Sequence, residues 1–298
     1  MERYNNVKAI IGLVRPFTML APGVGVFSGG IIAVGFYNHS LEVNELFFLI
    51  LAASVFAMLN GASNAFNQVF DLNIDKVNKS YRPIPAGMIN LNNALFFSVL
   101  FYSMALFLAL IIGPTFTFVA GIFTLITVLY SIPPLRLKKR LWVSNITIAA
   151  ARSWVLLLGG WTAFNYTNPL EPAIWYVGLI LFVFLIGASA TKDFTDIPGD
   201  QKFGMNTLPV IYGVRRAKNM IIPFFMLPFV MIPLGTSLNV LTFKALHLTP
   251  LIGWSFYVVL MLSHDTKKTK KTENSLIWVH MYLILMALQV GFALVYLS

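Results

Sequence analysis

The sequence contains no cysteine and few charged side chains. Without cysteine, disulfide frameworks, thiolate metal sites and cysteine nucleophiles are all excluded. Charged residues make up 11% of the 298 residues, while 58% are hydrophobic and the mean hydropathy is +0.77. A soluble domain carries roughly 25% charged residues. A soluble globular protein is therefore excluded.

Long uncharged stretches occupy most of the chain instead. One membrane crossing needs roughly 20 apolar residues, so this length supplies about eight or nine crossings and leaves no room for a separate soluble domain. Stretches bounded by charges, Pro or Gly give nine candidate spans: 17–36, 46–64, 92–112, 115–131, 142–164, 172–191, 220–234, 248–263 and 276–297. Apolar residues at helical spacing over 7–14 predict a short additional helix in the membrane interface. The sequence thus predicts an all-α polytopic membrane protein with a single membrane domain over residues 1–298.

The excess of basic residues gives the orientation of these spans. The net charge is +10, from 21 Lys and Arg against 11 Asp and Glu. In a membrane protein such an excess marks cytosolic loops, so we expect no nucleic-acid partner. The N-terminal segment and the even-numbered loops hold 19 of the 21, four of them at 267–271, whereas Lys244 alone lies on the other side and Arg152 lies inside the fifth span. We expect a protein of the cell membrane with a cytosolic N-terminus and an external C-terminus.

The acidic residues are concentrated in two short segments on the predicted cytosolic side. Five of the six aspartates lie there: Asp71 and Asp75 after the second span, and Asp193, Asp196 and Asp200 after the sixth. Side chains four residues apart stay on one face of a helix, so Asn67, Asp71 and Asp75 can point into one cavity. In the second segment Pro198 and Gly199 interrupt the helical spacing, so we expect Asp200 on a loop. The prediction is a central cavity with aspartate-rich cytosolic loops.

The chemistry of this acidic set indicates a divalent cation. Facing carboxylates repel one another unless a cation lies between them, and oxygen ligands without His or Cys suit Mg²⁺ or Mn²⁺. A purely structural metal site is the alternative. Because Mg²⁺ usually joins one or two carboxylates to substrate phosphates, a diphosphate substrate is the expected third component, with Lys and Arg of the same loops offsetting its charge.

Both aspartate segments belong to longer motifs. NQVFDLNIDKVNKSYRPIPAG (67–87) is similar to NDxxDxxxD followed by RPIPxG, and DFTDIPGDQKFGMNTLPVIYG (193–213) is similar to a second aspartate motif with a trailing GxxTLPVxxG. YSIPPLRLK (130–138) and RPFT (15–18) match two further stretches. Through these motifs the whole chain resembles the UbiA superfamily of intramembrane prenyltransferases. It departs from the pattern at Gln68, where Asp is common, and at Pro198, where Glu is frequent, so no metal role is assigned to Gln68.

The resemblance implies transfer of a polyprenyl group, geranylgeranyl in the first instance, from its diphosphate to a lipophilic acceptor through an allylic carbocation. It implies Mg²⁺ as cofactor, the lipid bilayer as surroundings and no obligatory protein partner. The catalytic residues implied are Asp71, Asp75, Asp193, Asp196 and Asp200. These five and Asn67 are the implied metal ligands, and the implied diphosphate contacts are Asn67, Arg82, Lys138, Arg15 and Lys192.

Several alternatives stay open. The motifs look most like the branch that adds geranylgeranyl to geranylgeranylglyceryl phosphate and like the chlorophyll synthases, whereas an aromatic quinone precursor is the next acceptor. A membrane transporter of a cation or organic anion is the leading interpretation without an enzyme. A charge within a span should face the interior, so we expect Arg152 to pair with an aspartate, hold an anionic acceptor or bind backbone carbonyls. Gly25 and Gly29 predict close helix packing.

Overall fold

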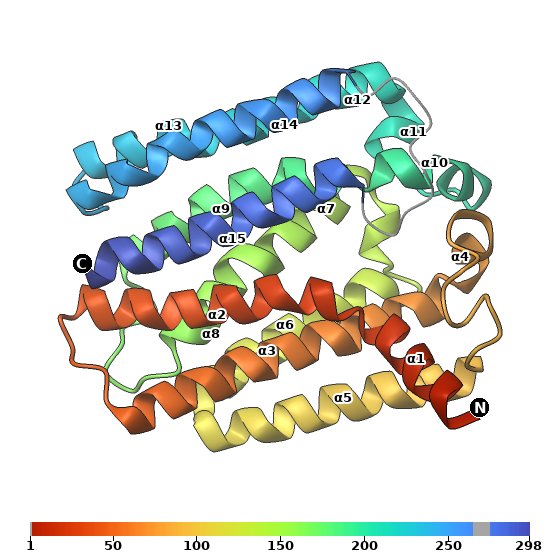
Figure 1. Cartoon of the computed structure of the whole chain (residues 1–298), viewed down its shortest axis with the longest axis horizontal. Coiled ribbons are helices and arrows are strands. Elements are labelled where there is room, and N and C mark those ends of the chain that lie inside the picture. Colours follow the sequence, from red (N-terminus) through yellow and green to blue (C-terminus); the bar gives the residue numbers. More distant parts are fainter. Residues whose placement is uncertain (1, 265–274) are drawn as a thin grey trace.

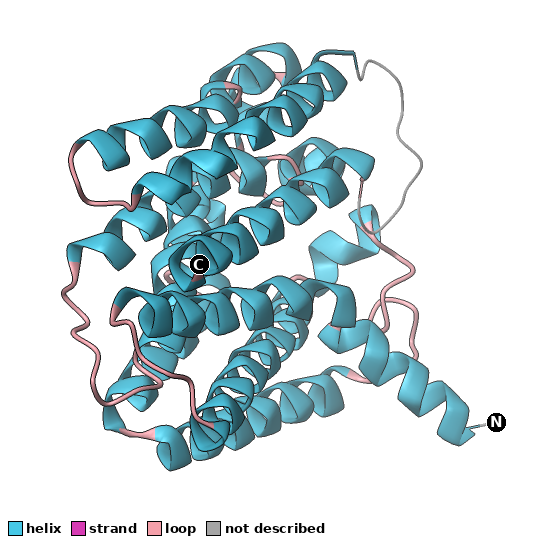
Figure 2. Ribbon diagram, turned by 60° about the vertical axis from the view of Figure 1, so that its left-hand side comes forward, coloured by secondary structure: helices cyan, strands magenta, loops and turns pink. Residues whose placement is uncertain are grey.

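The computed structural model describes residues 2–264 and 275–298, which form a bundle of helices without strands in these two ranges (Figure 2). In the described parts nine segments are long and apolar enough to cross a membrane. They are α2 (Pro16–Phe36), α3 (Val43–Phe70), α5 (Leu91–Ile112), α6 (Pro114–Ser131), the continuous α7 (Leu141–Ala150), η2 (Ala151–Val155) and α8 (Leu156–Trp161), α9 (Pro172–Ala190), α12 (Val214–Ile221) with α13 (Pro223–Ser237), η3 (Phe243–Leu251) with α14 (Ile252–His264), and α15 (Leu276–Leu297). Each overlaps a predicted span, so the prediction of nine membrane helices is confirmed.

The ends of these helices lie where the sequence stops or starts helical hydrogen bonding. Pro16 and Pro114 occupy the first turn of α2 and α6, where a missing N–H costs no hydrogen bond. Gly113 separates α5 from α6 with a φ of 152°, which a side chain would disfavour. Asn90 caps α5, because its side-chain oxygen accepts a hydrogen bond from Asn93 N at 2.7 Å.

Short helices gather at one end of the bundle. Figure 1 shows α1 (Glu2–Val14), α4 (Leu72–Asn78), α10 (Asp193–Lys202) and α11 (Leu208–Tyr212) together at this end, while the C-terminus lies at the opposite end. The helix predicted over 7–14 is part of α1. The aspartate segments, expected as loops, are therefore largely helical, since α4 and α10 carry them. The lysines at 267–271 lie outside the described residues.

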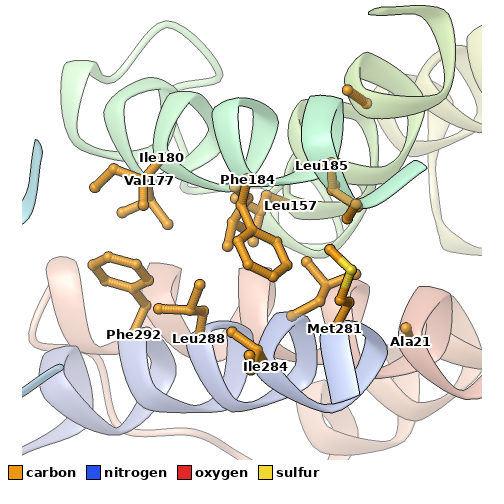
Figure 3. Close-up of a cluster of buried hydrophobic side chains, with 14 of the residues drawn as sticks. Ala21, Leu157, Val177, Ile180, Phe184, Leu185, Met281, Ile284, Leu288 and Phe292 are labelled. Carbon is orange, nitrogen blue, oxygen red and sulfur yellow. The ribbon is translucent and has the colours of Figure 1, made fainter. Parts of the chain in front are cut away.

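The largest apolar core lies beneath this end, between α9 and α15. Val177, Ile180 and Phe184 of α9 face Ile284 and Leu288 of α15, and all five side chains are fully buried (Figure 3). Because burying large aliphatic and aromatic side chains at close-packed density fixes the relative position of two helices, this core holds α9, the helix that leads to α10, against α15.

Glycines allow α2 to approach the fifth span closely. A Cβ atom at Gly29 would overlap the backbone of Leu157, and one at Gly160 would overlap Val26 O. At Gly25 a Cβ would collide with Gln289. The close packing predicted from Gly25 and Gly29 is therefore confirmed.

The outer surface of the bundle is apolar. Phe107, Leu110 and Phe118, for example, expose 66%, 65% and 70% of their surface. Contiguous exposed aromatic and aliphatic side chains are unfavourable in water but favourable against lipid chains. The chain is a multi-pass membrane protein.

Candidate active site

A cavity of about 200 Å³ opens at the end of the bundle where α4 and α10 meet. The structure brings all ten predicted site residues to its lining: Arg15, Asn67, Asp71, Asp75, Arg82, Lys138, Lys192, Asp193, Asp196 and Asp200. Segments more than a hundred residues apart in the sequence therefore contribute to one polar space. Phe123, Ile126 and Ala151 add apolar side chains to the lining.

The first aspartate segment passes through a helix break and still points into the cavity. Asn67 lies in the last turn of α3, Asp71 lies at the junction with φ −100° and ψ 6°, and Asp75 lies in α4. Asp71 N donates to Asn67 O at 2.9 Å and Asp75 N donates to Asp71 O at 2.8 Å. Because this hydrogen bonding between residues four apart continues across the junction, all three side chains keep one face, as predicted.

Gln68 points away from the cavity. Its side chain is buried, and Nε2 donates to Leu13 O of α1 at 2.8 Å. The glutamine thus joins α3 to α1 and does not line the cavity, in agreement with its exclusion from the metal ligands.

The second segment corrects one expectation. Asp200 does not lie on a loop, because α10 continues through Pro198 and Gly199 to Lys202. Proline removes one helical N–H and normally ends a helix, but this turn is supported from outside. Gly199 N donates to Asn78 Oδ1 at 2.8 Å, and Asn78 Nδ2 donates to Asp196 O at 2.7 Å.

Asn78 is the functional candidate that sequence reasoning missed. Its single side chain bonds two backbone groups of α10 from the end of α4, so it fastens the two aspartate-bearing helices together. Gly199 leaves space for this contact, since a Cβ there would overlap the Asn78 amide. The signal available in the sequence was only an Asn three residues after Asp75, which no local rule assigns to a partner 118 residues away.

Three of the five aspartates are held by basic side chains. Arg82 Nη1 donates to both carboxylate oxygens of Asp75 at 3.0 and 2.9 Å, and both residues are buried. Lys79 Nζ lies 2.5 Å from Asp196 Oδ2. Among the described residues Asp193 and Asp200 have no basic partner within 4.0 Å, and Asp200 Oδ2 accepts a hydrogen bond from Thr207 at 3.3 Å.

Asp71 is held by two cations at once. Lys138 Nζ lies 2.6 Å and Arg136 Nη2 lies 3.0 Å from Asp71 Oδ1. Lys138 Nζ also donates to Asn67 Oδ1 at 2.5 Å. These contacts orient the carboxylate and amide oxygens of the first segment toward the cavity.

Burial and crowding perturb the ionisation of this site. Desolvation raises the pKa of Asp200 to about 7, and the neighbouring Asp196 carboxylate adds to the increase. Desolvation likewise raises the pKa of Asp75 and of Asp193, and it lowers the pKa of Lys138 and of Lys192. Each shift means that the charged form of the side chain is poorly solvated in this cavity. A ligand of charge opposite to that of the side chain is therefore strongly favoured there.

The donor set fits a hard divalent cation that a phosphate ligand helps to hold. The candidate ligands are carboxylate oxygens and the Asn67 amide oxygen, which suit Mg²⁺. In the described parts of the chain no three His, Asp or Glu side chains approach closely enough to form a complete metal site by themselves. A cation here would therefore take one or two carboxylates from each helix and its remaining ligands from water and phosphate oxygens.

Two cations reach the cavity from unusual backbone conformations. Arg15 lies between α1 and α2 with a φ of 54°, a left-handed conformation that is rare outside glycine. Arg152 lies in η2, a π-helical turn inside the fifth span, and donates to Asn60 Oδ1 at 3.3 Å. The expected inward orientation of Arg152 is confirmed, and its observed protein partner is a side-chain amide.

Comparison with known proteins agrees with this architecture. The sequence profile described as the UbiA prenyltransferase family matches residues 25–295. The chain is 33% identical to the digeranylgeranylglyceryl phosphate synthase of Methanococcus maripaludis over 218 residues, 70% of each chain. It is 27% identical to the enzyme of that name from Methanocaldococcus jannaschii over 287 residues, 96% of each chain. Its fold is similar to a UbiA homolog from Archaeoglobus fulgidus bound to GPP and Mg²⁺, with a TM-score of 0.74, 20% identity and coverage of 97% of this chain and 99% of that one.

Proposed function

Because the chain belongs to the UbiA prenyltransferase family, we propose that this enzyme transfers a geranylgeranyl group from its diphosphate to geranylgeranylglyceryl phosphate, with Mg²⁺ as cofactor. The observation that carries the proposal is the convergence of α4 and α10 on one cavity lined by five aspartates and six basic residues. The names of the relatives support the acceptor. The bound ligands of the Archaeoglobus homolog support the diphosphate donor and the metal.

The two aspartate helices would hold the metal. Its protein ligands would come from Asn67, Asp71 and Asp75 on one side and from Asp193, Asp196 and Asp200 on the other. Bound Mg²⁺ supplies positive charge that neutralises the diphosphate leaving group. This assignment explains why so many carboxylates share a mouth in which burial disfavours their charged form.

The basic residues serve the leaving group. Arg82 and Lys138 hold Asp75 and Asp71 in place and add their charge to the diphosphate side of the cavity. Arg15 and Lys192 extend this basic lining. Fixed cations stabilise the charge that develops on the diphosphate, which lowers the barrier to breaking the allylic C–O bond.

The apolar part of the cavity serves the prenyl group. Phe123 and Tyr130 line it, and aromatic faces stabilise a cationic carbon by cation–π attraction. The C–O bond of the donor breaks with its electron pair remaining on the diphosphate. The acceptor hydroxyl oxygen then bonds to the prenyl carbon, and its proton passes to the released diphosphate.

The sidedness and organisation of the molecule follow the same proposal. We place the site and the N-terminus on the cytosolic face of the cell membrane and the C-terminus outside, as the distribution of Lys and Arg indicates. Residues 1–298 act as one domain, without nucleic acid or an obligatory protein partner. The family assignment favours an enzyme over the transporter that the same acids allowed.

Reconstitution tests the reaction and its acceptor. Purified protein in liposomes is given geranylgeranyl diphosphate, Mg²⁺ and, in separate reactions, geranylgeranylglyceryl phosphate, 4-hydroxybenzoate or a chlorin acceptor. We expect a digeranylgeranyl ether product by mass spectrometry in the first reaction, and its loss when EDTA removes Mg²⁺. If product forms only with the aromatic or the chlorin compound, that compound is the acceptor and geranylgeranylglyceryl phosphate is not. Movement of substrate across the membrane without any product would overturn prenyl transfer itself.

A further inference from the structure

A small side pocket extends from the cavity between η2, α9 and α15. Its volume is about 70 Å³, and its lining comprises Ile148, Arg152, Leu185, Ala188, Ser189, Lys192, Trp278, Met281, Tyr282 and Leu285. Five of these residues, including Arg152 and Lys192, also line the main cavity. The side pocket is therefore continuous with the proposed reaction site and has room for a small headgroup but not for a prenyl chain.

The side pocket contains two basic residues that the aspartates do not neutralise. Lys79, Arg82 and Lys138 each hold a carboxylate. By contrast, no carboxylate of the described residues lies within 4.0 Å of Arg152 or Lys192. Arg152 donates to the neutral Asn60 amide, and Lys192 Nζ lies 4.4 Å from the centre of the Trp278 ring.

An anionic ligand would stabilise this arrangement. Two positive charges share a narrow space whose other walls are largely apolar, where like charges repel and water solvates them poorly. Arg152 further depends on a π-helical turn, a rare distortion that is frequent at functional sites. The fold thus holds an arginine at membrane depth with only a weak protein partner.

The remaining walls indicate what kind of anion enters. Leu185 of α9 and Met281 of α15 both line the pocket. Figure 3 shows these two side chains on facing helices, and Leu285 lies one helical turn from Met281. A ligand here therefore places its anionic group beside apolar side chains. In the proposed function the aspartate helices hold the donor diphosphate, so the phosphate of the acceptor is the anion left for Arg152 and Lys192.

We propose that Arg152 and Lys192 form the headgroup subsite of the acceptor, in which they bind the phosphate monoester of an isoprenoid glycerol ether. This inference rests on the proposed function. The planar guanidinium of Arg152 matches two phosphate oxygens, and the Lys192 ammonium supplies a second charge at the border with the donor site. Because Lys192 lines both pockets and directly precedes Asp193, a phosphate bound there lies next to the proposed diphosphate site.

The subsite makes this enzyme selective for a phosphorylated acceptor. Ether formation needs only a hydroxyl oxygen. An uncharged prenylated glycerol has that hydroxyl and can react, but it lacks the phosphate that binds Arg152 and Lys192. Charge-assisted hydrogen bonds to phosphate contribute enough to give a preference of about 10- to 100-fold.

The test compares two acceptors in the reconstituted, full-length protein. Wild type, Arg152→Met, Arg152→Lys and the control Arg216→Met are each given geranylgeranyl diphosphate and Mg²⁺ with geranylgeranylglyceryl phosphate or with the same lipid lacking its phosphate. Arg216 is exposed on α12 and lies outside both cavities. We expect Arg152→Met to raise the KM for the phosphorylated acceptor about 10- to 100-fold, with the donor KM and kcat changed less than about threefold.

The same variants separate phosphate binding from a structural role. Arg152→Lys should recover most of the loss, Arg216→Met should behave as wild type, and kcat/KM for the uncharged acceptor should stay unchanged in Arg152→Met. Lys192→Met should raise the KM of donor and acceptor together. If Arg152→Met does not fold, Arg152→Gln takes its place, because glutamine keeps a hydrogen-bond donor for Asn60. We expect the same increase in the KM for the phosphorylated acceptor.

Two results would overturn the inference. One is an unchanged KM for the phosphorylated acceptor in Arg152→Met and Arg152→Gln, and the other is an equal loss with both acceptors. If wild type itself makes no ether product with either lipid, the proposed function is wrong. This outcome differs from a failure of the inference, in which wild type is active and only the variants behave otherwise than expected.

Discussion

Asp71 shows how single side chains organise the cavity. It accepts from Lys138 at 2.6 Å and from Arg136 at 3.0 Å, and Lys138 in turn binds Asn67. Buried ion pairs contribute little net stability, because the attraction is largely offset by the loss of hydration. Their effect here is positional, since they aim carboxylate oxygens into the cavity and keep the cations beside them.

Replacing Asp71 by asparagine separates this role from folding. Asp71→Asn keeps the shape but removes the charge, so we expect prenyl transfer to fall at least about 100-fold. The midpoint of thermal unfolding should change by only a few degrees, because Lys138 retains Asn67 and Arg136 retains Phe70 O. Initial rates and thermal unfolding in detergent measure the two effects.

A matched carboxylate serves as the control for that variant. Glu171 precedes α9, at the end of that helix away from α10, and makes no side-chain cap hydrogen bond. Glu171→Gln should leave the rate unchanged. A near-normal rate in Asp71→Asn would contradict the assignment of this aspartate to the metal.

At the scale of elements, the decisive contact joins α4 to α10. Asn78 forms two hydrogen bonds to α10, at 2.7 and 2.8 Å, and Lys79 adds an ion pair to Asp196. The separation of the two aspartate sets therefore depends on one turn of α4. A metal shared by both helices is sensitive to that separation.

We expect Asn78→Ala to weaken Mg²⁺ binding at the site more than it weakens folding. Loss of two hydrogen bonds to buried backbone groups allows α4 and α10 to separate, so the Mg²⁺ concentration for half-maximal rate should rise about tenfold. The rate at saturating Mg²⁺ should recover substantially. A titration of Mg²⁺ against initial rate measures this shift.

Asn219→Ala is the control for this change, because Asn219 is exposed on α12. It should give the wild-type titration. If Asn78→Ala has the same Mg²⁺ dependence as wild type, the hydrogen bonds to α10 do not position the aspartates.

Helix α10 also marks the limit of prediction for single elements. Pro198 and Gly199 each disfavour a helix, so local propensity predicted a loop at Asp200. The turn is helical because Asn78 satisfies Gly199 N and Asp196 O from another part of the chain. No property of residues 193–202 alone contains that information.

At the scale of the whole molecule, the end of the bundle that holds the N-terminus, α4 and α10 lies opposite the C-terminus (Figure 1). This arrangement follows from an odd number of spans. Together with the distribution of Lys and Arg, it supports our proposal that the cavity faces the cytosol.

The absence of cysteine makes this orientation directly measurable. Lys202→Cys introduces a thiol at an exposed position near the cavity, and Leu170→Cys introduces one at a residue that is 75% exposed at the other end. In intact cells an impermeant maleimide should label Leu170→Cys but not Lys202→Cys. Permeabilised cells should label both, and wild type should stay unlabelled. The reverse pattern in intact cells would invert the proposed topology.

The sequence by itself determined the membrane class, the nine spans, the charged end and the ten residues that meet at the cavity. These follow from the sequence because hydropathy, charge and helical spacing are properties of neighbouring residues, and because lipid forces each apolar stretch into a helix. Gln68, to which the sequence assigned no metal role, does not line the cavity.

Only the tertiary structure decided which side chains meet across the bundle. It placed Gln68 against α1, fastened α10 through Asn78, and opened a pocket beside Arg152 and Lys192. Each of these contacts joins segments separated by about 40 to 120 residues, and its existence depends on how close-packed helices approach one another. Local sequence patterns contain no information about how closely two helices approach each other, whereas tertiary packing fixes that distance.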